Sequence, residues 1–174
     1  QVITDYHVAL ADQEVDAVYV LTPNYAHHLI AIDALNAGKH VFCEKPVALT
    51  YPLALQMAAA AEKNHRMLNV GVCNRYNLAA EQLHELNAQG RFGTIYHVLC
   101  SFRSSRMIPG LGGAFTDKSK SGGGVIIDWG VHFFDLIFYI LGGARVESAT
   151  CDTYREMAKN MKESGKKVVK NYLN

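Results

Sequence analysis

The chain has 174 residues, 49% of them hydrophobic and 19% charged, and its 17 basic and 16 acidic side chains leave a formal net charge of +1. This composition is typical of a folded globular protein of one or two small domains. The near balance of charge excludes a broad basic field, so we expect neither a nucleic acid nor a membrane surface as a partner. The one lysine-rich stretch, residues 159–170, includes Glu163 and is interpreted as a solvated tail.

The cysteines are widely spaced and form no CxxC pair; they are Cys43, Cys73, Cys100 and Cys151. Three of the four lie in apolar runs typical of strands, which favours small core residues in a reducing, cytoplasmic compartment over a metal site. No apolar run of about 18 residues is free of charge, so no membrane span is expected. No signal peptide is visible, but because the chain does not begin with Met, one upstream of Gln1 stays open.

The first part of the chain predicts a β-α-β unit. Residues 15–23, VDAVYVLTP, form a short β-branched apolar run that ends in turn residues, which indicates a strand. A helix is expected over 24–38, where apolar residues recur at helical spacing and Gly38 is placed to end it. The run HVFCEKP then resumes a buried strand that stops at Pro46.

A further helix and strand extend this pattern. Thr50 is the expected N-cap of a helix over 51–65, and residues 67–73 supply a third strand. Strands that alternate with helices of this length predict a parallel sheet covered by helices, as in a Rossmann-type domain. The sequence contains no GxGxxG turn to bind a diphosphate, so we expect the chain to start inside such a domain.

The pattern changes near Cys73 and Asn74. We expect a helix near 79–89, a strand in TIYHVLCSFR, a long helix over about 124–141 and a further strand in ARVESATCDTY. The predicted fold is therefore α/β, with residues 1–73 as the C-terminal part of a Rossmann domain. Residues 74–174 are expected to begin an α+β domain with a mainly antiparallel open sheet, which binds substrate or forms oligomers.

The stretch SGGGVIIDWGVHFFDL carries polar groups in an apolar helix. Asp128 and His132 are four residues apart, so on a helix they share one face, with Asp135 a turn further along. An isolated Asp–His pair on an apolar helix more often has a structural role than a catalytic one. A histidine side chain has an ordinary pKa of about 6.5, which also suits a general base. The preceding glycines, 122–124, are either a flexible lead-in or a site of close approach to cofactor or substrate; we favour the second.

Two motifs together resemble the Gfo/Idh/MocA family of NAD(P)-dependent oxidoreductases, which act on sugars and cyclitols. They are TPNYAHHLIAIDALNAGKHVFCEKP and SGGGVIIDWGVHFFDL, in the order that the family shows, and the likeness extends from about Val15 to Thr153. The resemblance implies a longer subunit with a complete Rossmann domain and a C-terminal open sheet. It thus implies that this chain is a fragment without the phosphate-binding loop, and that the intact protein is a homo-oligomer.

The resemblance also assigns roles to particular residues. The implied catalytic set is Lys45, Asp128 and His132. The implied cofactor-binding residues are Thr22, Pro23, Asn24, His27, Glu44, Lys45 and Arg75, and the Lys45–Pro46 peptide is expected to be cis. Substrate contacts are assigned to Lys45, Asp128, His132, Arg103 and Arg106. Independently of the family, Lys45 follows a predicted parallel strand, at the sheet edge where α/β domains bind ligands.

Hydride transfer from a secondary alcohol needs a base, a group that stabilises the developing alkoxide, and a bound cofactor. His132 is the expected base, Lys45 the expected polarising cation, and Asp128 either binds a substrate hydroxyl or orients the imidazole. The sequence therefore predicts a dehydrogenase or reductase that uses NAD or NADP and takes a sugar, cyclitol or related polyol. Two alternatives stay open: an NAD-dependent glycosidase of the same fold, and a truncated or non-catalytic nucleotide-binding protein.

Overall fold

The structure, a computed structural model, describes residues 2–103 and 113–154. The chain divides into two compact units. Unit 1 comprises Gln1–Val72 and Ser119–Val131, and unit 2 comprises Cys73–Lys118 and His132–Asn174. The sequence pattern placed one boundary near Cys73; in the structure a later segment, Ser119–Val131, packs with the first unit as well.

Unit 1 is built on a parallel sheet of three strands in the order β1-β2-β3. The strands are β1 (Ala17–Val20), β2 (His40–Cys43) and β3 (Leu68–Val70). Val18 lies opposite Val41, which lies opposite Leu68 on the next strand. These short β-branched runs were predicted as strands, and the Rossmann-type parallel sheet is confirmed.

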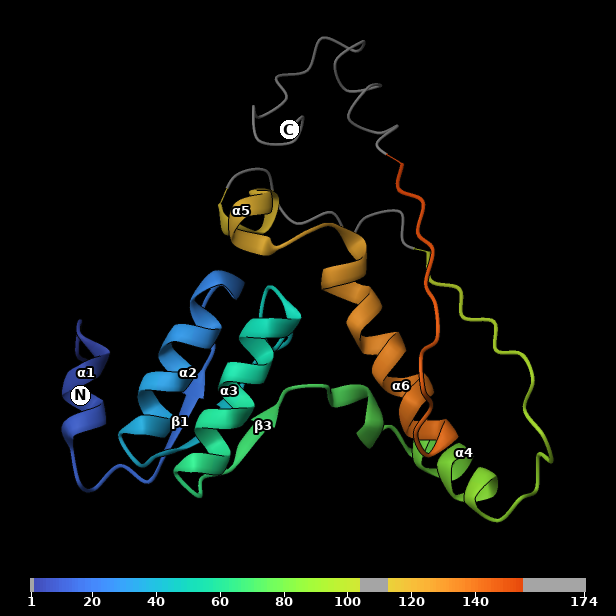
Figure 1. Ribbon diagram of the computed structural model, residues 1–174, viewed down its shortest axis with the longest axis horizontal. Coiled ribbons are helices and arrows are strands. Elements are labelled where there is room, and N and C mark those ends of the chain that lie inside the picture. Colours follow the sequence, from blue (N-terminus) through green and yellow to red (C-terminus); the bar gives the residue numbers. More distant parts are fainter. Residues whose placement is uncertain (1, 104–112, 155–174) are drawn as a thin grey trace, which may run out of the picture. The chain divides into compact units, whose positions relative to one another are not determined.

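Three helices belong to the same unit: α1 (Tyr6–Ala11), α2 (His27–Asn36) and α3 (Tyr51–Lys63). Consecutive strands that lie side by side in parallel are joined by right-handed crossovers, which place α2 and α3 on one face of the sheet. Figure 1 shows these two helices next to each other over the strands. The sequence pattern did not predict α1, a short helix whose Asp5 cap accepts a hydrogen bond from the N–H of His7.

The core of unit 1 is small and made of aliphatic side chains. Leu35, Ala31, Ala34, Cys43 and Met57 are completely buried. Gly38 ends α2 as expected, with a φ of 78° that suits glycine at the end of a helix. Thr50 is the N-cap residue of α3, although its side chain makes no capping hydrogen bond.

The later segment of unit 1, Ser119–Val131, contains all but the first residue of α5 (Lys118–Ser121) and a π-helical turn, Ile126–Gly130. In that turn the N–H of Val131 reaches back to the carbonyl of Ile126, one residue further than in an α-helix. The long helix predicted over 124–141 is therefore not a uniform α-helix. Its regular part is α6 (Val131–Leu141).

Unit 2 contains a short 3-10 turn, Cys73–Tyr76, the helix α4 (Leu78–Ala88), a second 3-10 turn, Ala114–Thr116, and α6. The helix predicted near 79–89 is confirmed as α4, with Asn77 accepting a hydrogen bond from the N–H of Ala79 at its start.

The strands predicted at 94–103 and 144–154 are not formed in the described residues. Both segments lack helix or strand pairing, and Tyr96 and Leu99 are 95% and 84% exposed. A strand needs a partner for its backbone hydrogen bonds, and no part of the chain that the structure describes supplies one. The antiparallel open sheet is therefore not shown.

One stretch, Lys118–Leu141, is long and apolar enough to cross a membrane, by length and composition alone. This candidate was not predicted from the sequence, because a span was expected only from an apolar run of about 18 residues without any charge. A core helix of a globular protein passes the same test. Two of its charges have partners within the units, Asp128 with Lys45 and Asp135 with Arg75. We therefore interpret the stretch as part of the globular units.

Candidate functional site

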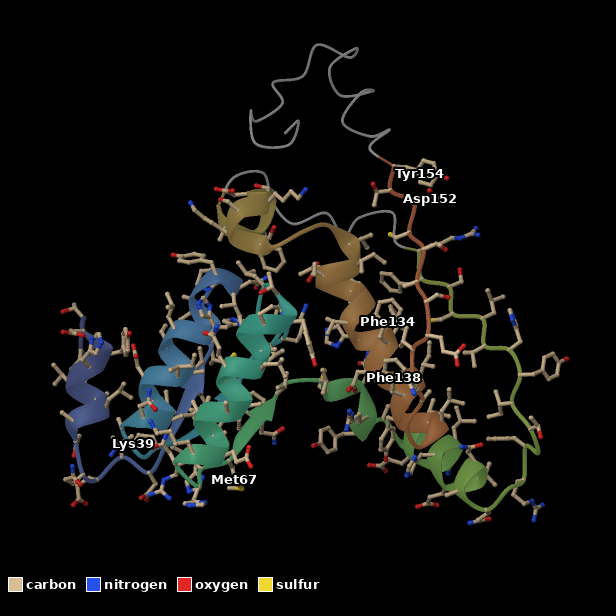
Figure 2. All side chains as sticks on the ribbon, viewed as in Figure 1. Lys39, Met67, Phe134, Phe138, Asp152 and Tyr154 are labelled. Carbon is tan, nitrogen blue, oxygen red and sulfur yellow. The ribbon has the colours of Figure 1, made fainter. Side chains whose placement is uncertain are left out.

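The strands of a parallel sheet end at a common edge, and the candidate residues of unit 1 gather there. Thr22, Pro23 and Asn24 follow the end of β1, and Glu44 and Lys45 follow the end of β2 directly. Thr22 and Pro23 are exposed, whereas the other three side chains are half-buried. The opposite edge, where β2 and β3 begin, is marked in Figure 2 by the labelled Lys39 and Met67.

The centre of the site is a bonded pair, Lys45 and Asp128, which lie 83 positions apart in the sequence. The Lys45 ammonium donates to the Asp128 carboxylate at 2.8 Å and to the main-chain carbonyl of Asp128, also at 2.8 Å. The two side chains are 18% and 24% exposed, so water screens the pair only in part. An ammonium has three N–H donors, so two are engaged and the third can bind a ligand oxygen.

The π-helical turn presents Asp128 to Lys45 in this way. Because Lys45 binds the carbonyl as well as the carboxylate, the contact fixes the backbone of the turn as well as its side chain. π-helical turns inside longer helices occur often at functional sites. The spacing of apolar residues in the sequence did not predict this π-helical turn.

The segment around the glycines is held by two further contacts in unit 1. The Asn24 side-chain amide donates to the carbonyl of Ser121 at 2.9 Å. A Cβ atom at Gly122 would lie 2.8 Å from the Leu49 side chain, and the φ of this glycine is 84°. A Cβ at Gly124 would meet nothing within 4 Å. The close approach of Gly122 is thus made to the loop after β2, and Ser121 and Leu49 are site-forming residues that the sequence did not single out.

Glu44 lies against the backbone of its neighbours. Its carboxylate accepts a hydrogen bond from the N–H of Lys45 at 3.1 Å, and a Cβ at Gly71 would lie 3.1 Å from one carboxylate oxygen. Glycine at the end of β3 therefore leaves the room that the Glu44 side chain fills. The Lys45–Pro46 peptide is cis, as expected.

His27 is 1% exposed and lies at the first residue of α2. Its Nδ1 is 2.7 Å from the carbonyl oxygen of Pro46, and its Nε2 is 2.8 Å from the carbonyl oxygen of Thr22. Both ring nitrogens are therefore engaged by the backbone of the loops that follow β1 and β2.

In unit 2, Arg75 forms a two-pronged ion pair with Asp135. Its Nε donates to one carboxylate oxygen at 2.7 Å and its Nη2 donates to the other. The hydrogen bonds to Asp135 raise the pKa of Arg75, and the guanidinium also lies 5.5 Å from the ring centre of Tyr139. The His84 ring stacks on that tyrosine, with 4.4 Å between the ring centres. Arg75 thus joins the 3-10 turn after Val72 to α6.

The remaining candidates are also assigned to unit 2 or lie outside the description. His132 is half-buried in the first turn of α6, and Arg103 is exposed in a segment without helix or strand. Arg106 lies outside the described residues. The structure therefore brings Lys45, Asp128 and Asn24 together in unit 1, whereas His132 and Arg75 belong to unit 2.

Two other kinds of chemistry, a cysteine nucleophile and a bound metal ion, can be compared with the described residues. Burial raises the pKa of the Cys43 thiol to about 12, which removes this cysteine as a nucleophile near neutral pH. Among residues 2–103 and 113–154 no group of three or more His, Cys, Asp or Glu side chains is placed to hold a metal ion.

The residues after β1 and β2 fit the ribose and nicotinamide half of a dinucleotide, because they offer a hydroxyl, an amide, a carboxylate and an ammonium at the ligand edge of the sheet. Those residues are Thr22, Asn24, Glu44 and Lys45. A Rossmann-type sheet with these residues at its ligand edge defines the class of the chain as a dinucleotide-binding α/β protein.

The comparisons with known proteins define the family. A model of the GFO/IDH/MocA oxidoreductases, described as an NAD-binding Rossmann fold, matches residues 1–72, and a model of the GFO/IDH/MocA C-terminal domain matches residues 80–169. The chain belongs to the GFO/IDH/MocA family, which confirms the resemblance seen in the two motifs.

The D-glucoside 3-dehydrogenase of Escherichia coli (strain K12) is 36% identical over 82% of the chain, which corresponds to 40% of that protein. An oxidoreductase domain protein from Kribbella flavida has a TM-score of 0.75 and 38% identity over 80% of the chain and 38% of its own. A levoglucosan dehydrogenase in complex with NADH and levoglucosan has a TM-score of 0.70 and 26% identity, over 80% of the chain and 39% of its own. The chain thus spans about 40% of the length of such relatives.

Proposed function

We propose that the whole protein transfers a hydride between the nicotinamide of NAD or NADP and a secondary alcohol or ketone carbon of a sugar, cyclitol or related polyol. The observation that carries the proposal is the Lys45–Asp128 pair at the ligand edge of a Rossmann-type sheet. Relatives named for the oxidation of glucosides and of levoglucosan support the substrate class.

Lys45 binds the reacting oxygen of the substrate in this proposal. Two of its N–H groups are held by the carboxylate and carbonyl of Asp128, and the third donates to the oxygen on which negative charge develops. Asp128 fixes the ammonium and accepts a hydrogen bond from a neighbouring substrate hydroxyl. A half-buried, partly desolvated ammonium stabilises an alkoxide better than a fully hydrated one does.

His132 is proposed as the general base that accepts the hydroxyl proton when the alcohol is oxidised and returns it when the ketone is reduced. An ordinary histidine exchanges its proton close to neutral pH, which suits this task. The nicotinamide, when bound, accepts or supplies the hydride. Its ribose and carboxamide are proposed to contact Thr22, Pro23, Asn24, Glu44 and Lys45. Arg75 and His27, which also have partners within their own units, are proposed to contact the cofactor as well.

The first test is a titration of this chain with NADH and NADPH, followed by the fluorescence of Trp129, the only tryptophan and the neighbour of Asp128. Saturable quenching is expected. The second test incubates the whole protein with NAD or NADP and a panel of sugars and cyclitols, and follows both nicotinamide absorbance and sugar product.

Variants of the whole protein test the roles. We expect His132→Gln to lower kcat by about 10²–10⁴ and Lys45→Met by about 10²–10³. The exposed Lys63 lies in the last turn of α3, so Lys63→Met is the matched control and should leave turnover unchanged. Full turnover in His132→Gln would contradict its role as base. Sugar release without net nicotinamide reduction would select an NAD-dependent glycosidase, and cofactor binding without turnover of any substrate would select a non-catalytic protein.

Further parts of the prediction stay proposals for the whole protein. We propose that residues 94–103 and 144–154 join an antiparallel open sheet in a substrate and oligomerisation domain over 74–174, and that Arg103 and Arg106 contact the substrate. The proposed state is a cytoplasmic homo-oligomer without a nucleic acid or membrane partner. Sedimentation of the whole protein tests the oligomer, and cell fractionation tests the compartment.

A further inference from the structure

The segment 119–131 of unit 1 contacts the ligand edge of the sheet near both of its ends. Near its C-terminal end, the Lys45 ammonium holds the carboxylate and the main-chain carbonyl of Asp128, each at 2.8 Å. Near its N-terminal end, the Asn24 side chain donates to the carbonyl of Ser121 at 2.9 Å, across 97 positions of the sequence. Because both ends are bonded, each contact limits how far the other end can move.

The direction of the contact from Asn24 follows from its partner. A main-chain carbonyl only accepts hydrogen bonds, so the amide nitrogen of Asn24 must face Ser121. An asparagine side chain also has an oxygen that accepts, on the other branch of the amide. One asparagine is therefore able to bond the segment and to accept a hydrogen bond from a ribose hydroxyl at the same time.

Ser121 is a suitable anchor because its surroundings hold it in place. It is 6% exposed, and its hydroxyl donates to the carbonyl of Gly123 at 3.1 Å, a local bond that favours a turn. The next residue, Gly122, has a φ of 84°, and a Cβ there would lie 2.8 Å from the Leu49 side chain. Burial, a turn and close packing thus hold the carbonyl to which Asn24 donates.

The path from this anchor to Asp128 is short and internally bonded. Only residues 122–127 separate Asp128 from Ser121. Within that path the carbonyl of Gly124 accepts from the N–H groups of Ile127 and Asp128, at 3.0 and 3.2 Å. A displacement of Ser121 is therefore passed on to Asp128, because no long flexible loop lies between them to absorb it.

We infer that Asn24 is a positioning residue, which acts by anchoring the carbonyl of Ser121. The anchored segment in turn sets where Asp128 meets Lys45. Asn24 begins the 3-10 turn that follows β1, where the nicotinamide ribose is proposed to bind, so one side chain links the cofactor loop to the segment that carries Asp128. The docking of the segment stands on these contacts alone, whereas its consequence for turnover rests on the proposed function.

The docking is tested by hydrogen exchange of this chain, measured at the backbone N–H groups of Ile127 and Asp128. Asn24→Asp keeps the shape of the side chain but replaces the donor by an oxygen, which repels the carbonyl of Ser121. We expect exchange at both amides to become about two- to tenfold faster, the effect of losing one net hydrogen bond. Unchanged exchange would overturn the inference.

Asn64 provides the matched control. It is half-buried like Asn24, and its amide donates to the carbonyl of Ala60 at 2.8 Å. It follows α3 and precedes β3, and therefore lies at the opposite edge of the sheet from the site. Asn64→Asp loses a similar bond and adds the same charge, so the exchange of Ile127 and Asp128 should stay unchanged. Equal acceleration in both variants would show a general loss of stability and overturn the inference.

In the whole protein, the positioning role separates kcat from KM. The aspartate in Asn24→Asp still accepts a hydrogen bond from a ribose hydroxyl, so the KM for the cofactor should change less than kcat does. A displacement of about 1 Å at a catalytic group lowers turnover by up to about 10²-fold, and we expect kcat to fall by about tenfold or more. A raised KM for the cofactor with an unchanged kcat would assign Asn24 to cofactor binding alone and overturn the positioning role.

Failure of this inference is distinguishable from failure of the proposed function. If the whole wild-type protein turns over no substrate but Asn24→Asp accelerates exchange in this chain as expected, the proposed function fails and the docking stands. If the wild type is active and Asn24→Asp matches it in exchange and in kcat, the proposed function stands and the inference fails.

Discussion

The two units of this chain are held together in different ways. Unit 1 has a cluster of buried aliphatic side chains around α2 and the sheet, with Leu35, Ala31 and Met57 fully excluded from water. In unit 2, Ala80 is the one buried hydrophobic residue among those that the structure describes. Its elements are joined by polar contacts instead. The Arg75–Asp135 pair joins the 3-10 turn Cys73–Tyr76 to α6, and His84 and Asn87 of α4 bond the carbonyls of Tyr139 and Ile140 on α6.

This difference shows what a partial set of secondary structure elements can stabilise. A parallel βαβαβ unit buries the face of its sheet that the crossover helices cover, because each of these helices packs back onto the strands beside it. A helix next to unpaired extended segments cannot do so: Phe134 on α6 is 52% exposed, and Figure 2 shows it one turn before Phe138 on that helix. The site residues that rest on unit 1 therefore have the firmer support.

The largest expected effect comes from truncating a leucine in each unit. Leu35 is completely buried in α2, whereas Leu83 in α4 is 41% exposed. Leu35→Ala should lower the free energy of unfolding of unit 1 by about 2–5 kcal/mol, and Leu83→Ala should cost at most about 1 kcal/mol. Urea unfolding, with hydrogen exchange to separate the units, measures both. Equal costs would show that unit 2 has a core of its own.

Removing the ion pair of unit 2 should come next. Asp135 is 15% exposed at its side chain, so Arg75→Met leaves a poorly solvated carboxylate and should destabilise α6 by about 1–3 kcal/mol. Arg75→Lys should restore little, because lysine cannot form the two-pronged contact. Hydrogen exchange of the α6 amides is the measurement. The exposed Arg91 offers a control, since Arg91→Met should leave exchange unchanged; the same loss in both variants would refute the role of the pair.

A smaller effect is expected at the glycines of unit 1. Gly122→Ala places a Cβ on a residue with a φ of 84° and against Leu49, which should cost about 1–2 kcal/mol and weaken NADH binding. Gly124→Ala meets open space at an ordinary φ and serves as the matched variant. Thermal unfolding and Trp129 quenching compare the two. If both variants behave alike, the contact between Gly122 and the loop after β2 does not stabilise the site.

The smallest effect is expected at α1, on the outside of unit 1. The Tyr6 hydroxyl donates to Asp33 at 2.6 Å, and this bond raises the pKa of Tyr6 to about 12. Tyr6→Phe should cost about 0.5–1 kcal/mol near neutral pH. Because the raised pKa favours the protonated hydroxyl, the stabilisation is complete below pH 10 and disappears as the pH rises through about 12. Urea unfolding of the wild type and of Tyr6→Phe from pH 8 upward should show that the difference in their free energies of unfolding becomes smaller. A difference that does not change with pH would show that it arises from packing and not from the hydrogen bond.

Much of unit 1 could be predicted because its signals are local. The β-branched runs that became β1 and β2, the helix that Gly38 ends and the position of Lys45 after a strand all follow from the spacing of neighbouring residues. The strands expected at 94–103 and 144–154 are not formed in the described residues for the opposite reason, since a strand exists only where another strand pairs with it. The helix α1 was not predicted because its six residues make fewer than two helical turns, too few for a helical spacing of apolar residues to be recognised.

The sequence by itself determined the alternation of strands and helices, the family, and the residue types that serve hydride transfer. Only the tertiary structure decided which of them meet. Lys45 contacts Asp128 across 83 positions of the sequence, and Asn24 contacts Ser121 across 97. The partners of the His27 ring are backbone carbonyls, which any residue type provides. Spacing along a chain reports local periodicity, whereas such contacts depend on how distant segments pack, and that is a property of the folded chain.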